Sequence, residues 1–109
     1  MNRGDLVAVA LQGEHGKPRP ALVIQSDLFV NLTSTVTIAP LTSAELDIPI
    51  FRVPIEPSET NGLRTRSFVM IDQTFSASTR RFGDAFGRLD DADMLSVNRA
   101  LAVFLGIAS

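Results

Sequence analysis

Short apolar runs separated by polar turns make up the first ninety residues of the chain. Residues 5–11 are apolar on both faces of an extended strand, and residues 21–24 form a second apolar run rich in β-branched residues. Both runs are typical of strands that are buried on both sides. Residues 35–39 alternate threonine with apolar residues and stop at Pro40, which predicts a third strand.

The chain then carries signals for two or three further strands. In residues 50–55 every second residue is apolar, and Pro54 favours an edge strand because proline cannot donate an N–H to a neighbour. Residues 67–71 form a compact apolar run, and residues 82–89 are compatible with one more short strand. Residues 74–81 are polar, and we expect little regular structure there.

The last twenty residues have the period of an amphipathic helix. Asp90 suits the N-cap position, and apolar residues recur at three- and four-residue steps from Met94 to Leu105. Gly106 is placed to end the helix. We therefore expect one helix over residues 91–105, with an apolar stripe that packs on the sheet.

Five or six strands followed by one helix predict a mainly β protein with a small α part. The expected architecture is a small, strongly curved antiparallel sheet or partly closed barrel with a C-terminal helix. A chain of 109 residues supports one domain with a core of useful size. We expect a single domain over residues 1–109.

The cysteine and histidine content narrows the chemistry. The chain has no cysteine and one histidine, His15. A disulfide framework, a thiolate metal site and most zinc sites are therefore excluded, as is a ribonuclease mechanism that needs two histidines. We expect neither a metal nor another cofactor.

The charge argues against a protein that coats nucleic acid without specificity. Such proteins carry a basic stripe, whereas this chain has a formal net charge of −2. Nine of its ten basic residues are arginine, which suits bidentate contacts with phosphate and stacking on bases. A local basic site for nucleic acid remains compatible with the sequence.

No segment predicts export or membrane insertion. The first five residues lack the apolar core of a signal peptide, and the longest apolar run, residues 100–108, is too short to span a bilayer. We expect a cytoplasmic protein without a membrane partner.

Arg19 is the strongest candidate for chemistry because of its neighbours. Pro18 and Pro20 stiffen the loop expected just before the strand at 21–24, so Arg19 is held with little conformational freedom. A preorganised guanidinium can grip phosphate or carboxylate in a forked geometry. Nearby Glu14 and His15 can supply proton transfer. The alternatives are a surface ion pair for Arg19 and a solvated loop for its neighbours.

Two strand ends carry further polar candidates. Thr42 and Ser43 follow the strand at 35–39, where a hydroxyl can donate to phosphate or bond the local backbone. Asp72 and Gln73 follow the strand at 67–71, which places a carboxylate at a strand end.

Several of these stretches together resemble the MazF/PemK family of bacterial toxins, the PemK/Kid branch in particular. The resemblance covers nearly the whole chain, including the terminal helix. Its motifs are Arg3-Gly4-Asp5-Leu6-Val7, Pro18-Arg19-Pro20-Ala21-Leu22-Val23-Ile24, Ala39-Pro40-Leu41-Thr42, Gly62-Leu63-Arg64-Thr65 and Ile71-Asp72-Gln73.

The resemblance implies a CcdB/MazF-like, SH3-like barrel and a metal-independent endoribonuclease that cuts single-stranded mRNA at a short sequence. It implies that Arg19 and Thr42 form the catalytic pair and that Asp72 is the base. Metal-free RNA cleavage needs a base for the 2′-OH proton, a fixed cation for the phosphate charge and an acid for the leaving oxygen. The candidates for RNA binding or the remaining proton transfer are Glu14, His15, Lys17, Arg64, Arg66 and Gln73.

The resemblance also implies partners. Toxins of this family act as homodimers with RNA in a groove across the interface, and a cognate antitoxin neutralises them with an acidic, partly disordered segment. The chain departs from the Kid branch at Met70, where that branch has an arginine two residues before the aspartate.

Two alternative functions stay open. Three stretches resemble CcdB, a DNA gyrase inhibitor with the same fold and no nuclease activity: Gln25-Ser26-Asp27, Pro40-Leu41-Thr42-Ser43-Ala44 and Leu105-Gly106-Ile107. CcdB lacks the Arg-Pro signature and has tryptophan in place of Leu105. The other alternative is a barrel that only binds a partner peptide.

Overall fold

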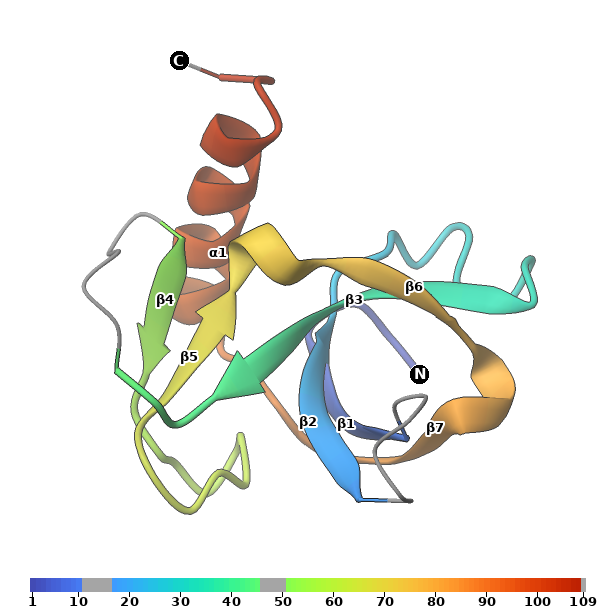
Figure 1. Cartoon of the computed structure of the whole chain (residues 1–109), viewed down its shortest axis with the longest axis horizontal. Helices are drawn as coiled ribbons and strands as arrows, with labels where there is room; N and C mark the ends of the chain where they lie inside the picture. The colour runs from blue at the N-terminus through green and yellow to red at the C-terminus, as the bar shows by residue number, and fades with distance from the viewer. Residues whose placement is uncertain (11–16, 46–50, 109) are drawn as a thin grey trace.

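Seven strands form one antiparallel sheet, with a C-terminal helix beside it, in the computed structural model of the chain (Figure 1). The structure describes residues 1–10, 17–45 and 51–108. The strand order is β4-β5-β3-β2-β1-β7, β6 pairs with part of β3, and the sheet curves without closing into a barrel. The elements are β1 (Asp5–Ala10), β2 (Pro18–Val23), β3 (Thr35–Thr42), β4 (Arg52–Ile55), β5 (Ser67–Met70), the 3-10 turn η1 (Ile71–Gln73), β6 (Phe75–Ser78), the 3-10 turn η2 (Thr79–Arg81), β7 (Phe82–Arg88) and α1 (Asp91–Phe104).

The long strand β3 organises the sheet because one of its edges serves two partners. Thr35 to Ile38 pair with β6, and Leu41 and Thr42 pair with β5. The other edge pairs with β2. The turn η1 carries the chain from β5 to β6 opposite the point where β3 changes partner.

Alternating side chains of β3 contribute to two cores on opposite faces of the sheet. Val36 and Ile38 belong to one core, and Ala39 and Leu41 belong to the other. The first core, built on β1, β2, β3 and β6, contains Val7, Val9, Ala21, Val23, Val30, Val36, Ile38 and Ala77. The second core, which includes α1, contains Leu6, Leu22, Ala39, Leu41, Val53, Ile55, Val69, Ile71, Leu89, Val97 and Leu101.

Helix α1 follows the sequence prediction closely. The Asp90 side chain accepts the N–H of Asp93 at 2.8 Å and caps the first turn. Val97 and Leu101 are its buried residues and pack in the second core. None of the helices in the described ranges is long and apolar enough to cross a membrane.

The predicted fold class is confirmed, and β4 lies at a sheet edge as expected. Three local expectations were wrong. Strand β3 does not stop at Pro40 but runs to Thr42, because Leu41 and Thr42 pair with β5. Residues 74–81 contain β6 and η2, because pairing with β3 and burial of Ala77 stabilise a strand whose own apolar pattern is short. Arg19 lies within β2, because β1 pairs with β2 as far as Pro18.

Candidate functional site

Two adjoining pockets lie beside the ends of β2 and β3, and Arg19 and Thr42 line both. The first pocket has a volume of about 300 Å³ and the second about 340 Å³. Arg19 is exposed and Thr42 is half-buried. The structure thus brings the two strongest sequence candidates together, and their catalytic role stays a prediction.

The pairing of β2 with β3 explains why Arg19 and Thr42 meet. The ladder pairs Ala21 with Pro40. If the same register is continued for two more residues, Arg19 of β2 falls opposite Thr42 of β3. Side chains two apart on a strand share a face, so both side chains lie on the face that carries Ala21.

Prolines end the β2–β3 ladder where the pockets begin. The Val23 carbonyl accepts from the N–H of Gly4 on the β1 side. By alternation, Pro20 and Pro18 direct their backbone nitrogens toward β3, and proline has no N–H to donate. The pairing with β3 accordingly stops at Ala21, while the pairing with β1 continues. The sequence thereby leaves room between the strand ends.

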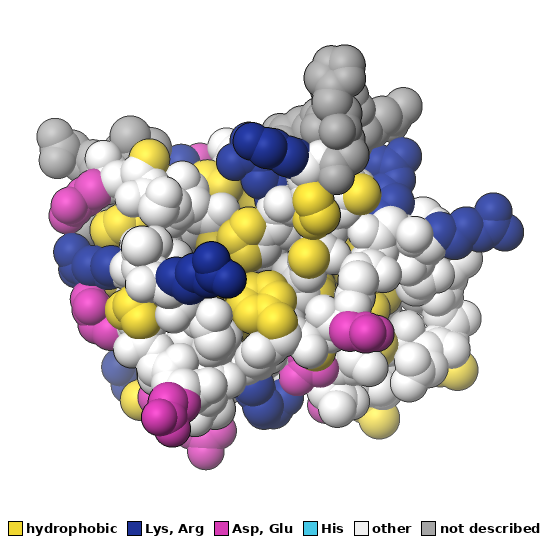
Figure 2. Space-filling view, turned by 90° about the horizontal axis from the view of Figure 1, so that it is seen from below, with side chains coloured by type: hydrophobic (Ala, Val, Ile, Leu, Met, Phe, Trp, Pro, Cys, Tyr) yellow, Lys and Arg dark blue, Asp and Glu magenta, His cyan; other side chains and the backbone are white. Residues whose placement is uncertain are grey.

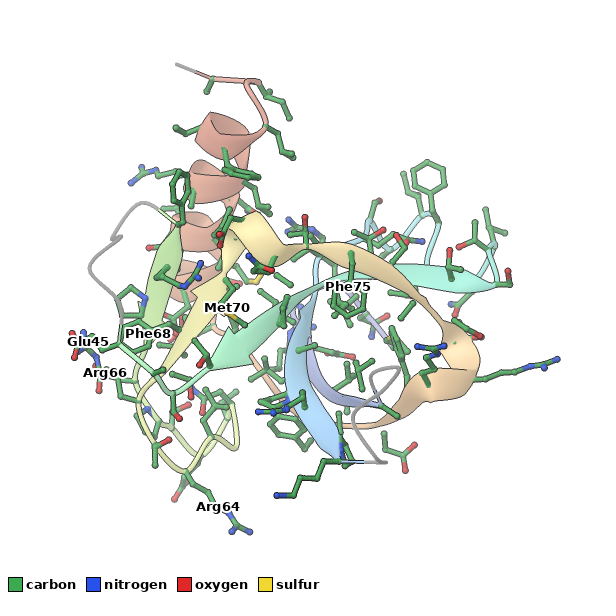
Figure 3. All side chains as sticks on the ribbon, in the orientation of Figure 1. Glu45, Arg64, Arg66, Phe68, Met70 and Phe75 are labelled. Carbon is green, nitrogen blue, oxygen red and sulfur yellow. The ribbon has the colours of Figure 1, made fainter. Side chains whose placement is uncertain are left out.

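A third proline lies at the change of partner on the other edge of β3. Pro40 falls between Ile38, the last residue paired with β6, and Leu41, the first paired with β5. The first pocket forms at this interruption, between side chains from β5, η1 and β6; Figure 3 labels Met70 and Phe75. Besides Arg19, Pro40 and Thr42, its lining residues are Leu41, Met70, Gln73 and Phe75.

The Thr42 side chain is held by a local hydrogen bond. Its hydroxyl oxygen accepts the N–H of Ala44 at 3.1 Å. A hydroxyl has one proton to donate in addition to its acceptor sites, so the O–H of Thr42 can still be given to a ligand in either pocket. This arrangement orients a donor beside a guanidinium.

The loop between β4 and β5 forms one side of the second pocket, and the buried Asn61 holds it. The Asn61 Oδ1 accepts the N–H groups of Ser58 and Leu63, both at 3.0 Å, and its Nδ2 donates to the Glu56 carbonyl at 2.8 Å. Gly62 has a φ of +70° and lies against the Phe86 carbonyl, where a Cβ would come within 2.7 Å. A side chain at this position would displace the loop.

Two arginines of this loop have different environments, as Figure 3 shows. Arg64 lines the second pocket. Arg66 does not, and its Nε donates to Glu56 Oε1 at 2.7 Å, while its guanidinium carbon lies 5.2 Å from the centre of the Phe68 ring. A second carboxylate, that of Glu45, lies 3.6 Å from Arg66.

Asp72 is paired with Arg52, a buried residue of β4. Arg52 Nη1 donates to Asp72 Oδ1, and Gln73 Nε2 donates to Asp72 Oδ2 at 3.3 Å. Burial alone would raise the pKa of Asp72, but the hydrogen bonds from Arg52 and Gln73 and the charge of Arg52 outweigh it and lower this pKa below its ordinary 3.8. Asp72 is therefore ionised at neutral pH. Its side chain lines neither pocket.

The face that carries the start of β2 and the β4–β5 loop combines basic and apolar surface. In Figure 2, basic side chains border an apolar area in the middle of this face, and most acidic side chains lie to its left and below it. Basic and apolar surface together suit a ligand with phosphates and bases.

The remaining candidates have less support from their positions. Glu14 and His15 lie outside the described residues. Lys17 is exposed and lies directly before β2 but lines neither pocket. Within the described ranges, no three His, Cys, Asp or Glu side chains gather closely enough to hold a metal ion.

Sequence reasoning missed two residues that shape the site, Arg52 and Asn61. Arg52 is the one charged residue in the alternating stretch 50–55, which was a usable signal for a special position. Asn61 forms an Asn-Gly dipeptide with Gly62, which is typical of a turn.

Comparisons with known proteins give consistent matches. Residues 2–105 match the family model of the PemK-like, MazF-like toxin of type II toxin-antitoxin system. A Mycolicibacterium smegmatis protein named "Probable endoribonuclease MazF" is 44% identical to this chain over 109 residues, which cover 99% of each chain.

Solved structures share the fold. An endoribonuclease in complex with its cognate antitoxin from Mycobacterial species has a TM-score of 0.84 at 25% identity, covering 100% of this chain and 98% of that chain. The Mycobacterium tuberculosis toxin MazF-mt6 has a TM-score of 0.82 at 22% identity, covering 96% and 99%.

Proposed function

The chain belongs to the family of PemK-like, MazF-like toxins of type II toxin–antitoxin systems, and on that premise we propose that it is a metal-independent, sequence-selective endoribonuclease. The name of the Mycolicibacterium smegmatis relative supports this activity. The observation that carries the proposal for this chain is that Arg19 and Thr42 line the same two pockets.

The chemistry assigned to this pair is stabilisation of the transition state. Attack of a ribose 2′-OH on the adjacent phosphate builds negative charge on the phosphate oxygens. The guanidinium of Arg19 is charged at any ordinary pH and offers several donors to those oxygens. The O–H of Thr42 adds one more donor from the facing strand. Donors fixed before the reaction are worth most, because they need no reorganisation as charge develops.

The two pockets provide places for the nucleotides on either side of the cleaved bond. The first has a largely apolar lining with Met70 and Phe75, which suits the face of a base. The second includes Arg64, which suits a phosphate. RNA that crosses between the pockets would pass the Arg19–Thr42 pair.

The proton-transfer groups stay predictions. Asp72 is the base that the family resemblance implies, and its carboxylate is ionised as a base requires. The pairing of Asp72 with Arg52 weakens its proton affinity and argues against that role. Glu14 and His15 remain candidates from the sequence.

We assign the protein a cognate antitoxin and a homodimeric state in the cytoplasm. The mycobacterial endoribonuclease with a similar fold was solved with its cognate antitoxin, and Deinococcus radiodurans MazF was solved with MazE. An acidic antitoxin segment would bring carboxylates to Arg19 and Arg64, in the places where RNA phosphates would bind.

Incubation of the purified protein with single-stranded RNA in EDTA tests the proposal. We expect cleavage by the parent protein, a loss of about 10² to 10³-fold in rate for Arg19→Ala, and little change for the exposed control Arg80→Ala, which lines neither pocket. A DNA gyrase supercoiling assay run in parallel tests the CcdB-like alternative. Intact RNA together with gyrase inhibition would replace the nuclease assignment.

A further inference from the structure

A relay of three side chains links the buried edge of the sheet to the first pocket. Arg52 of β4 lies across from Met70 of β5 in the strand register. Its Nη1 donates to the Phe51 carbonyl at 3.2 Å and to Asp72 Oδ1. The other carboxylate oxygen of Asp72 accepts from Gln73 Nε2 at 3.3 Å. Gln73 lines the first pocket with Arg19 and Thr42, whereas Arg52 and Asp72 do not.

This relay fixes which way the Gln73 amide faces. An ionised carboxylate only accepts hydrogen bonds, so the amide atom turned toward Asp72 is the nitrogen donor. Nε2 has given one of its two N–H groups to Asp72, so Gln73 still has the acceptor Oε1, on the side of the amide away from Asp72, and one N–H to offer. Arg52 holds the carboxylate in turn, so the amide orientation depends on a residue outside the pocket.

Stability alone does not explain a charged residue at position 52. Arg52 is 8% exposed, and its Nε–H has no hydrogen-bond acceptor among the described residues. Burying a charge with an unpaired donor is costly, and apolar replacements of buried ion pairs are often neutral or stabilising. The Arg52–Asp72 pair therefore invites a functional explanation.

We propose that Arg52 and Asp72 are positioning residues that hold the Gln73 amide with its carbonyl oxygen toward the first pocket, where Gln73 selects an RNA nucleotide through a hydrogen-bond donor. The inference rests on the proposed endoribonuclease function. The donor is the 2′-hydroxyl or the base edge of the nucleotide in that pocket. Asp72 then orients Gln73, instead of acting as the base that the family resemblance implies.

A double-mutant cycle tests whether Arg52 acts through Gln73. In cleavage of a preferred single-stranded RNA, we expect Arg52→Met and Gln73→Ala each to lower kcat/KM about tenfold, the effect of losing one hydrogen bond to substrate. The change should appear mainly as a higher KM. The double variant, Arg52→Met with Gln73→Ala, should lose no more kcat/KM than Gln73→Ala alone. Arg52→Lys should restore part of the loss, while the exposed helix residue Arg99 gives a neutral control as Arg99→Met. Additive losses would overturn the relay.

Asp72→Asn separates orientation from base catalysis. An asparagine at 72 that accepts from Arg52 turns its own NH₂ toward Gln73, which would reverse the Gln73 amide and present Nε2 to the pocket. We expect a changed nucleotide preference with cleavage retained, read from a randomised RNA pool and from substrates with single 2′-deoxy substitutions. If the preference changes only for the identity of the base, the donor that Gln73 contacts is a base edge. If the change depends on a 2′-deoxy substitution, the donor is the 2′-hydroxyl. A loss of 10² or more on every RNA with no change in preference would identify Asp72 as the base and overturn the proposal.

A measurement without RNA tests the Arg52–Asp72–Gln73 contacts independently of the nuclease proposal. In NMR spectra of the whole chain, the side-chain amide of Gln73 should shift in Arg52→Met and in Asp72→Asn but not in Arg99→Met. An unchanged Gln73 resonance in the first two variants would overturn the relay even if the parent cleaves RNA. Conversely, a parent that leaves RNA intact while showing these shifts would overturn the nuclease proposal and keep the relay.

Discussion

Arg19 of β2 and Thr42 of β3 line the same two pockets, beyond the last residues that pair these two strands. Pro18 and Pro20 end the pairing of β2 with β3, and Pro40 lies where β3 changes partner. The same residues that stiffen these strands therefore leave pockets beside them. A rigid sheet edge can hold charged and polar groups in place more firmly than a free loop can.

The hydroxyl of Thr42 should matter more for the cleavage rate than for folding, where it contributes one exposed hydrogen bond from Ala44. Thr42→Val keeps the shape of the side chain but removes the donor, and we expect a fall in cleavage rate of about a hundredfold. Thr42→Ser keeps the hydroxyl and should retain most of the activity. Single-turnover cleavage of a short RNA measures both.

Thr35→Val is the matched control for Thr42, because Thr35 lies on the same strand and lines neither pocket. Its cleavage rate should equal that of the parent. Equal rates for Thr42→Val and Thr35→Val would remove Thr42 from the catalytic pair.

Arg64 should contribute an electrostatic contact with the RNA backbone. It is exposed in the second pocket and forms no ion pair with another described residue. The affinity for a single strand falls as salt concentration rises. Each phosphate that a cation neutralises makes the plot of log affinity against log salt concentration steeper by about 0.7. Arg64→Ala should lower this slope by about 0.7, measured by fluorescence anisotropy with labelled RNA in the Arg19→Ala background. The same slope in both proteins would mean that Arg64 contacts no phosphate.

Local sequence rules located much of the fold and part of the site. The apolar pattern marks α1, which buries one stripe, and β1 and β3, which bury side chains on both faces of the sheet. Arg19 was identifiable because its two flanking prolines are adjacent to it in the sequence. The strand β6 was missed because only Phe75 and Ala77 alternate there, and its stability comes from pairing with β3, some forty residues away.

The Arg52–Asp72 pair shows why the rest was out of reach. The two residues are twenty positions apart, and they meet only because β4 pairs with β5 and η1 follows directly. From the sequence, Arg52 looks like an outward-facing residue of an edge strand and Asp72 like an open carboxylate. Their mutual pairing changes both interpretations, and it depends on strand register that no local pattern specifies.

Asn61 should be needed to keep the second pocket in shape. Asn61→Ala would leave the N–H groups of Ser58 and Leu63 and the Glu56 carbonyl without their partner. We expect a loss of about 1–3 kcal/mol in the free energy of unfolding, measured with urea, and weaker RNA binding. The exposed Asn31 is the control, since its side chain forms no hydrogen bond with another described residue. A fully stable Asn61→Ala variant would show that the loop is held by other contacts.

The lowered pKa of Asp72 predicts how stability depends on pH. A carboxyl group that is more acidic in the folded state stabilises the fold above its unfolded pKa, here near 3.8, and this contribution is lost as pH falls through the lower folded value. Asp72→Asn should therefore be less stable than the parent at pH 5 to 7, and the two curves should converge below pH 3.8. Urea unfolding at intervals between pH 7 and pH 2 measures the difference. Arg52→Met removes the hydrogen bond and the charge of Arg52, leaves the hydrogen bond from Gln73, and should therefore weaken this pH dependence. A parent curve that stays parallel to that of Asp72→Asn across the whole range would show that Arg52 does not hold the carboxylate.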